Sequence, residues 1–282
     1  GTVKRIGKGN TLIVDLGKVE AILPARFYPK TERYAVGDRI QALLLEVRDR
    51  EDGGAEVVLS RTHPEMVEQL FTQEVPELAD KTVTIEKIAR DAGYRTKLAV
   101  SSTDQKVDPL GACVGVRGTR VKNIIRELGG EKIDIVHYTD DPIELLQRLL
   151  EPIEIRKMFI DDENNAVTIV VGDEDYPIVI GKRGSNARLN AEMIEAELLV
   201  KKASEYESQI ESEQTELATQ ESPLLDESLD SDGVNQFVVD ALLEAGFTTR
   251  RKLLETNSKD LSKAASISEE MAAEVLEKVR NS

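Results

Sequence analysis

Val114-Gly115-Val116-Arg117-Gly118 and Ile180-Gly181-Lys182-Arg183-Gly184 are two versions of one short stretch, and they decide the fold. In each version, two glycines frame a pair of residues that includes arginine. Glycine lets another backbone approach closely and accepts φ values that other residues avoid. The versions lie 66 residues apart. That distance fits one small domain each, so the pattern predicts a tandem repeat.

A helix is predicted immediately after each stretch. Apolar residues recur there at spacings of three and four, which is typical of the buried face of a helix. They are Val121, Ile124, Ile125 and Leu128 after the first stretch, and Leu189, Met193 and Ala196 after the second. The free amide groups and the positive dipole end of a helix N-terminus favour phosphate. Each stretch and its helix therefore predict a phosphate site.

This arrangement resembles the Gly-x-x-Gly loop by which KH modules clamp the backbone of about four nucleotides. We therefore expect both loops to bind RNA. The expected contacts are Gly115, Val116, Arg117, Gly118, Arg120 and Lys122 in the first, and Gly181, Lys182, Arg183, Gly184, Asn186 and Arg188 in the second. Most of these contacts would be to phosphate and sugar, so sequence preference should be modest.

The net charge of -16 argues against a nucleic-acid partner until its distribution is considered. Residues 203–233 contain ten carboxylates and neither lysine nor arginine. Exposed charges further apart than a Debye length of about 8 Å are largely screened from one another. The cations around the two glycine-framed stretches therefore matter more for RNA than the total charge does.

Composition also limits the compartment and the class of protein. Cys113 is the single cysteine, which excludes a disulfide framework and favours a buried structural thiol. No apolar run approaches the roughly 18 residues of a membrane span, and no secretory signal is present. We expect a cytoplasmic monomer without a membrane or a cofactor. The chain begins at Gly1, inside a predicted strand, so we expect a fragment of a longer protein.

Nothing in the sequence indicates an enzyme. His63 and His137 are the only histidines and lack metal-ligand spacing. The pairs Asp140-Asp141 and Asp161-Asp162 fall in predicted turns and helix caps, where carboxylates are ordinary. No Walker loop, nucleophile elbow or cysteine cluster is present. We expect no catalytic residue and no metal site.

Residues 1–62 predict a small β-barrel, because short alternating apolar runs are separated by turn sequences. The expected strands are Thr2–Ile6, Thr11–Leu16, Val19–Leu23, Ile40–Val47 and Glu56–Leu59. Five strands in this length suggest an OB-type barrel, and Leu59-Ser60-Arg61 resembles the S1 RNA-binding domain. Such barrels bind single strands with stacking aromatics, here Phe27, Tyr28 and Tyr34. Both an RNA contact and a spacer role remain open.

Residues 63–151 and 152–202 are predicted to be two type II KH domains, because one order of elements occurs twice. That order is helix, strand, strand, helix, loop, helix, strand. The expected strands are Val83–Ala89, Lys97–Val100 and Ile133–His137, then Ile153–Ile160, Ala166–Val171 and Glu197–Val200. A helix with a leucine-rich face begins at Pro142, which suits the first turn of a helix.

A richer resemblance covers about residues 1–202. The run Val107-Asp108-Pro109-Leu110-Gly111-Ala112-Cys113-Val114 before the first loop, and Glu127 to Val136 after it, resemble the bacterial NusA family. So does the second loop with Asn186, Arg188 and Leu189. The resemblance implies transcription elongation, pausing, termination and antitermination, exerted by binding RNA polymerase and nascent single-stranded RNA. The family's N-terminal polymerase-binding domain has no counterpart here, which leaves polymerase binding by this piece open.

The remaining residues predict a linker and a helical module. Residues 203–233 read as an acidic linker, with a possible helix from Ala203 to about Ala218. Residues 234–282 resemble a helix-hairpin-helix repeat. The predicted turn Ala264-Ala265-Ser266-Ile267 lacks the glycine of the DNA-binding form, which favours protein docking. Other elongation factors are further candidate partners through this module.

The sequence as a whole predicts a multidomain α+β protein. Its parts would be an S1 barrel, two KH domains, an acidic linker and a small all-α C-terminal module. The expected function is RNA-binding transcription regulation. The alternative is a non-catalytic protein-interaction scaffold whose KH folds do not bind RNA.

Overall fold

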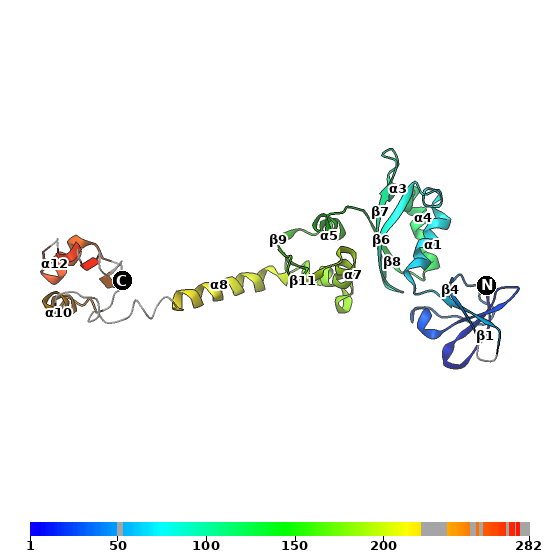
Figure 1. Cartoon of the computed structure of the whole chain (residues 1–282), viewed down its shortest axis with the longest axis horizontal. Helices are drawn as coiled ribbons and strands as arrows, with labels where there is room; N and C mark the ends of the chain where they lie inside the picture. The colour runs from blue at the N-terminus through cyan, green and yellow to red at the C-terminus, as the bar shows by residue number, and fades with distance from the viewer. Residues whose placement is uncertain are drawn as a thin grey trace. The chain divides into compact units, whose positions relative to one another are not determined.

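The computed structural model describes residues 1–49, 53–220, 236–248, 252–253, 256–268, 271–273 and 275–276. The chain divides into two units, Gly1–Ala203 and Ser204–Ser282 (Figure 1). Helices and sheets together make this an α+β protein, and the three described sheets lie in the first unit. None of the described helices combines the length and the apolar character that a bilayer crossing requires.

The first sheet has the strand order β1-β2-β3-β5-β4. Its strands are β1 Thr2–Ile6, β2 Leu12–Asp15, β3 Glu20–Leu23, β4 Leu43–Asp49 and β5 Ala55–Ser60. The segment ahead of β4 pairs with β1, since Val3 donates to the Asp38 carbonyl at 2.8 Å and Ile40 to the Gly1 carbonyl at 3.0 Å. This pairing explains why β4 begins later than expected, at Leu43. Val3, Leu12, Val14, Ala21 and Leu23 fill the core.

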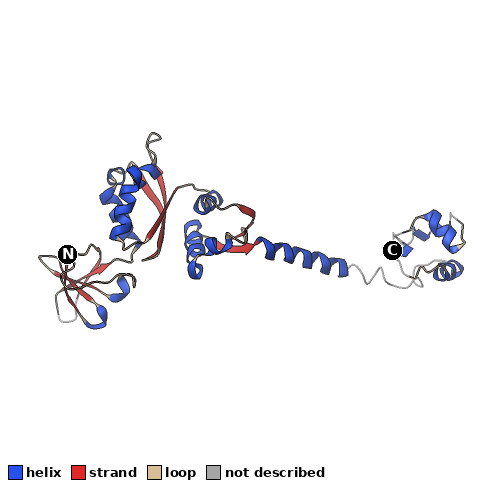
Figure 2. Cartoon of the chain, turned by 180° about the vertical axis from the view of Figure 1, so that it is seen from behind, coloured by secondary structure: helices blue, strands red, loops and turns tan. Residues whose placement is uncertain are grey.

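The second sheet, β6-β7-β8, belongs to the first α/β domain. The elements of this domain are α1 Pro64–Glu74, α2 Pro76–Ala79, β6 Val83–Asp91, β7 Arg95–Ser102, α3 Pro109–Val114, α4 Thr119–Glu127 and β8 Lys132–His137. Helices α1, α3 and α4 cover one face of the sheet (Figure 2). Met66, Phe71, Leu98 and Ile124 are buried between them together with Cys113, as expected for that thiol.

The third sheet, β11-β10-β9, belongs to the second α/β domain. The elements of this domain are α5 Pro142–Leu150, β9 Ile155–Asp161, β10 Ala166–Val171, α6 Tyr176–Ile180, α7 Ser185–Ile194 and β11 Glu197–Lys202. Leu145, Leu146 and Leu149 of α5 pack into one cluster with Ile169 and Leu189. The expected boundary after residue 151 therefore separates α5 from the core that buries its apolar face, and the packing begins the second domain at Pro142.

The two α/β domains share an apolar interface. Ala89 on β6 and Ala99 on β7 belong to the core cluster of the second domain, while Leu98 belongs to that of the first. Helix α7 lies beside β6 (Figure 1), and small alanine side chains allow this close approach. Lys87 Nζ reaches the Met193 carbonyl at 3.1 Å, at the C-terminal end of α7. There a cation meets the negative end of the helix dipole.

The second unit is helical in the part that the structure describes. Its helices are α8 Ala203–Gln220, α10 Gln236–Glu244 and α12 Ser258–Ala265. Helix α8 occupies the first part of the expected acidic linker, where a helix was one of the expectations. Asn257 caps α12 by accepting from the Asp260 amide at 2.9 Å, and Ser266 ends it at a φ of 55°. Parts of the expected module at 234–282 lie outside the described residues.

Candidate nucleic-acid interface

The two glycine-framed loops follow one backbone path. The first glycines, Gly115 and Gly181, have φ of 73° and 70° with ψ of 171° and 178°. A Cβ at Gly115 would lie 2.8 Å from Cγ of Arg120, and one at Gly181 would lie 2.7 Å from Cβ of Asn186. Both the backbone conformation and the lack of space therefore require glycine.

An arginine occupies the left-handed region in each loop. Arg117 and Arg183 both have a φ of 56°, a conformation that costs a side-chain-bearing residue roughly 1–2 kcal/mol. Strained positions of this kind cluster at functional sites. Both arginines are exposed, as is Lys182, and Val116 is 81% exposed. The two loops thus present their central pairs to solvent.

The helices behind the loops begin without a side-chain cap. Gly118 and Gly184 are the N-cap residues of α4 and α7, and neither helix has a side-chain hydrogen bond at its start. By contrast, Asp108 and Asp141 cap α3 and α5 with their carboxylates. The first amide of each helix, of Thr119 and of Ser185, already donates to a carbonyl of the loop, that of Val116 and of Lys182. The positive dipole end of each helix still favours an anion beside it.

Two of the expected contacts in the first loop region also brace the loop. Arg120 Nη1 donates to the Ala112 carbonyl at 2.6 Å and pairs with Glu77 Oε2 at 3.1 Å. Its guanidinium therefore closes the C-terminal end of α3. Lys122 is exposed, and its Nζ donates to the Arg117 carbonyl at 2.9 Å. Of the two, Lys122 is the better placed for a phosphate.

In the second loop region, the expected contacts Asn186 and Arg188 separate into a buried brace and an exposed cation. Asn186 is 6% exposed, and its Nδ2 donates to the carbonyls of Ile178 and Val179 at 3.0 and 3.2 Å. The expected phosphate contact from Asn186 does not fit this placement, because the amide closes α6 as Arg120 closes α3. The side chain of Arg188 is 63% exposed, and its Nη2 lies 3.0 Å from Asp91 Oδ2.

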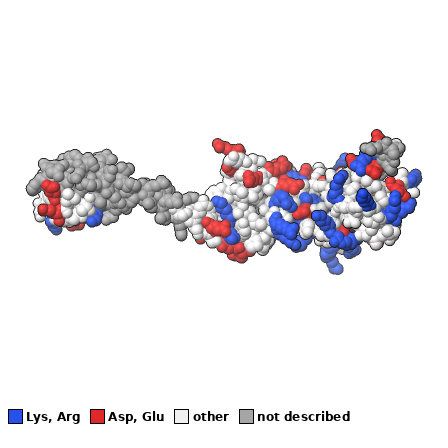
Figure 3. Space-filling model, turned by 90° about the horizontal axis from the view of Figure 1, so that it is seen from below, with Lys and Arg blue, Asp and Glu red and all other residues white. Residues whose placement is uncertain are grey.

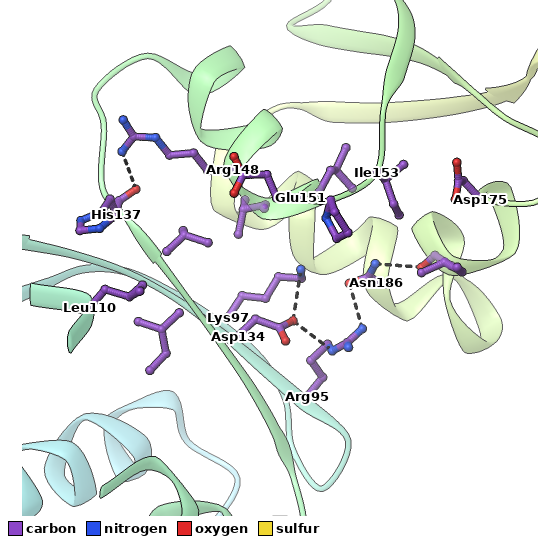
Figure 4. Close-up of a pocket in the computed structure, with 16 residues that line it drawn as sticks. Arg95, Lys97, Leu110, Asp134, His137, Arg148, Glu151, Ile153, Asp175 and Asn186 are labelled. Atoms are coloured by element: carbon purple, nitrogen blue, oxygen red, sulfur yellow. Dashed lines mark hydrogen bonds and ion pairs between the residues drawn. The ribbon is translucent and has the colours of Figure 1, made fainter. Parts of the chain in front are cut away.

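A hollow of about 780 Å³ lies between the two α/β domains (Figure 4). Leu110 of α3 lines one part and Ile178 of α6 another, so the hollow extends from the helix before the first loop to the helix before the second. Its floor carries Arg95 and Lys97, which reach Asp134 Oδ2 at 3.1 and 3.4 Å. Cations thus lie along the space that joins the two loop regions.

Sequence reasoning missed the two floor cations. Arg95, Lys97 and Ala99 alternate along β7, so they share the face that meets the second domain. The side chain of Lys97 is only 2% exposed, and burial lowers its pKa while Asp134 opposes that effect. Two cations alternating with buried residues in a central strand were the available signal.

The aromatic side chains of the first sheet are partly buried against its hydrophobic core. Phe27, Tyr28 and Tyr34 pack against the sheet's buried cluster, and the Tyr28 and Tyr34 rings meet edge to face at 5.9 Å. The guanidinium of Arg61 lies 5.9 Å from the Tyr34 ring. These rings have less free surface for a base than the sequence suggested.

On the face shown in Figure 3, lysine and arginine side chains gather over the Gly1–Ala203 unit. Among the described residues, no group of three or more His, Cys, Asp or Glu could hold a metal. His63 caps α1 by accepting from the Glu65 amide at 3.2 Å, and His137 lies apart from it on β8.

Comparisons with known proteins cover both α/β domains. Residues 61–138 match the NusA-like first KH domain, and residues 142–208 match the NusA-like second KH domain. The second match begins where α5 begins, in agreement with its packing.

Three relatives are transcription termination/antitermination proteins NusA. That of Halalkalibacterium halodurans is 42% identical over 194 residues, which are 69% of this chain and 50% of that protein. That of Bacillus subtilis is 42% identical over 68% of this chain and 52% of its own length. That of Rickettsia conorii is 36% identical over 100% of this chain and 55% of its own length. The chain spans about half the length of the curated relatives it matches.

Proposed function

This chain belongs to the NusA family, and from that premise we propose that it binds nascent single-stranded RNA and modulates RNA polymerase pausing, termination and antitermination. Its relatives are transcription factors and not enzymes, and this chain is likewise not an enzyme. RNA and RNA polymerase are the proposed partners, and the chain acts as a monomer.

The observation that carries the proposal is the repetition of one loop geometry. Arg117 and Arg183 share a strained φ of 56°, both loops are exposed, and both lead into helices without a side-chain cap. Packing of a hydrophobic core does not by itself require an exposed, strained loop of this kind in both domains. Two equivalent anion sites joined by one hollow fit one extended polynucleotide strand.

The strand would run from the first loop across the hollow to the second. Five exposed cations are placed to meet its phosphates: Arg117, Lys122, Lys182, Arg183 and Arg188. Bases would contribute less than the backbone, so sequence preference would be modest.

The parts outside the KH domains have supporting roles in this proposal. The five-stranded sheet is an S1 barrel of the OB type, and its packed aromatics favour the spacer role over a direct RNA contact. Residues 203–233 connect the RNA-binding unit to a helix-hairpin-helix-like module at 234–282. That module docks protein, either polymerase or another elongation factor, because its turn Ala264-Ala265-Ser266-Ile267 lacks the glycine of the DNA-binding form.

Charge reversal in the loops tests RNA binding against the scaffold alternative. The variant Val116→Asp/Arg117→Asp/Lys182→Asp/Arg183→Asp should lose single-stranded RNA binding and keep its melting temperature, because these side chains are exposed. The second half of this variant, Lys182→Asp/Arg183→Asp, is also made alone and should weaken RNA binding. Its charge-matched control is Lys259→Asp/Lys263→Asp on α12, which should bind RNA as the parent does.

The salt dependence of RNA binding is a second test of the same proposal. If about five phosphates are neutralised, log K against log salt should slope between about −3 and −4 for a single strand. A flat response, or undiminished binding by the four-residue variant, would favour the scaffold alternative.

A further inference from the structure

The turn between β6 and β7 places an aromatic ring beside the second loop. Tyr94 is 53% exposed. It lines a hollow of about 230 Å³ together with Asp91, Lys182, Arg183, Ser185 and Arg188. The ring comes from the first KH domain and three of the other side chains are cations of the second. This second site thus combines both domains.

The turn is fixed from behind by a buried carboxylate. Glu131 is 0% exposed, and its Oε2 accepts from the Gly93 amide at 2.7 Å. Arg90 donates to both Glu131 oxygens, at 2.9 and 3.0 Å. The Tyr94 carbonyl accepts from the Lys132 amide at 3.0 Å. These bonds fix the backbone of the turn, so the attachment point of the Tyr94 ring stays beside the second loop.

The barrel supports the other side of the turn. A Cβ on Gly93 would lie 2.7 Å from Pro29 Cβ and 2.5 Å from Thr31 Oγ1. The turn is therefore in close contact with the barrel, and a larger residue at 93 would displace it. The backbone that carries Tyr94 is preorganised before any ligand arrives, which lowers the entropy lost on binding.

We propose that Tyr94 is a stacking platform for a nucleobase of the strand held by the second Gly-x-x-Gly loop. Half-exposed tyrosines are common on protein surfaces. This one is distinguished by its fixed turn and by the hollow that it shares with three cations. Bases stack on aromatic rings while neighbouring cations hold the phosphates, and such stacking tolerates any base. Asp91 lines the same hollow and would repel a phosphate, which leaves that space to a base.

This inference rests on the proposed RNA binding, and a set of variants separates the two. Tyr94→Ala should weaken binding of a single-stranded RNA of about twelve nucleotides by about tenfold, while Tyr94→Phe stays near the parent because the ring remains. The slope of log K against log salt should not change, since no phosphate contact is lost. Phe159→Ala is the control, because Phe159 is 44% exposed on β9 and outside the hollow.

Each outcome decides between the two claims. If the parent binds RNA, loses it on Lys182→Asp/Arg183→Asp and is indifferent to Tyr94→Ala, the stacking proposal is wrong and RNA binding stands. If the parent binds no RNA, the proposed function itself is wrong. Equal losses in Tyr94→Ala and Phe159→Ala would also overturn the stacking proposal.

Fluorescence gives a readout that does not depend on affinity. The chain has no tryptophan, so Tyr94→Trp introduces a single reporter. Stacking on a base should quench its emission on saturation with RNA, while Phe159→Trp should respond little. Unchanged emission of Tyr94→Trp at saturation would contradict stacking and point to a hollow that serves another partner, such as a protein.

Discussion

At the scale of single residues, the fifth residue after the first glycine has the same structural role in both loops, although the residue type differs. Arg120 donates to the Ala112 carbonyl, and Asn186 donates to the carbonyls of Ile178 and Val179. Each therefore closes the helix that precedes its loop. Their residue types equally suit a phosphate contact, which is why the sequence suggested one.

Asn186→Ala should destabilise the fold without changing the charge contacts to RNA. Truncation leaves the buried carbonyl of Val179 and the part-buried carbonyl of Ile178 without this donor, at a cost of about 1–3 kcal/mol in the free energy of unfolding. Urea unfolding measures this cost. Arg188→Ala is the counterpart, because Arg188 is exposed and should change stability by less than about 0.5 kcal/mol. It should also flatten the salt slope of RNA binding by about 0.7. If Arg188→Ala destabilised the fold and Asn186→Ala flattened the salt slope, the structural role would belong to Arg188 and the phosphate contact to Asn186.

Lys97 is a charged residue whose burial in the floor of the hollow lowers the stability of the fold. Burial lowers its pKa below the ordinary 10.5, so the folded protein binds fewer protons than the unfolded chain between the two pKa values. Stability should therefore rise with pH in the interval just below 10.5, and the penalty of charging Lys97 is complete at lower pH.

Lys97→Met should raise the free energy of unfolding at neutral pH and remove that alkaline rise, because the buried charge is gone while Asp134 keeps its ion pair with Arg95. Urea unfolding from neutral to alkaline pH checks both effects. A destabilised variant, or an unchanged pH profile, would contradict this account of Lys97.

At the scale of elements, the two ends of α4 differ. Its start lies at the exposed first loop, and its end is tied by Arg61 to the domain of the first sheet. Arg61 Nη2 donates to the Glu127 carbonyl at 2.8 Å and to Glu32 Oε1 at 2.7 Å, and Nε donates to Glu32 Oε2 at 2.8 Å. The side chain of Arg61 is 3% exposed. The barrel thereby sets the position of the helix that follows the first loop.

Arg61→Lys should lower stability by about 2–3 kcal/mol, because lysine keeps the charge but cannot reproduce the forked bonds. Calorimetry should show the barrel melting earlier. Arg48→Lys is the matched control, since Arg48 Nη2 also meets a carboxylate, Glu56 Oε2 at 2.6 Å, but is 46% exposed. Its loss should be about 0–1 kcal/mol. Equal losses in both variants would contradict the role given to Arg61.

At the scale of the whole molecule, the two KH domains share an apolar core, and the proposed function requires them to act as one binding surface. Ala89 and Ala99 lie in the apolar cluster of the second domain, which fixes the spacing of the two loops. A strand that reaches both loops then gains from an intramolecular second contact.

Ala99→Leu should change the spacing of the two loops more than it changes the packing inside either domain, because Ala99 lies where the domains meet. Overpacking costs about 1–3 kcal/mol, and the loops should lose their fixed separation. The advantage of an RNA of about twelve nucleotides over one of about four, which spans a single loop, should shrink. Binding measurements with both lengths test this. An unchanged ratio of the two affinities would mean that the shared core does not set the loop spacing.

The sequence predicted what local pattern determines. The glycine-framed stretches, the buried faces of α4 and α7 and most strand positions follow from spacing and from residue type. It placed α5 in the first KH domain and not in the second, because the leucine face of Leu145 and Leu146 fits any neighbouring core. Nor could it reveal the contact of Arg61 with Glu127 or the position of Tyr94 beside Lys182. These pairs are distant in sequence and meet only through packing between domains.

The central claim is that both loops hold one RNA strand, and a crosslinking map tests it most directly. RNAs of about twelve nucleotides, each with one photoreactive base at a different position, would be crosslinked to the parent protein and the attached peptides identified. We predict crosslinks to residues 115–118 from one end of the strand and to residues 181–184 from positions some four or more nucleotides further on. Crosslinks that avoid the loops, or both loops attaching to the same nucleotide, would contradict it.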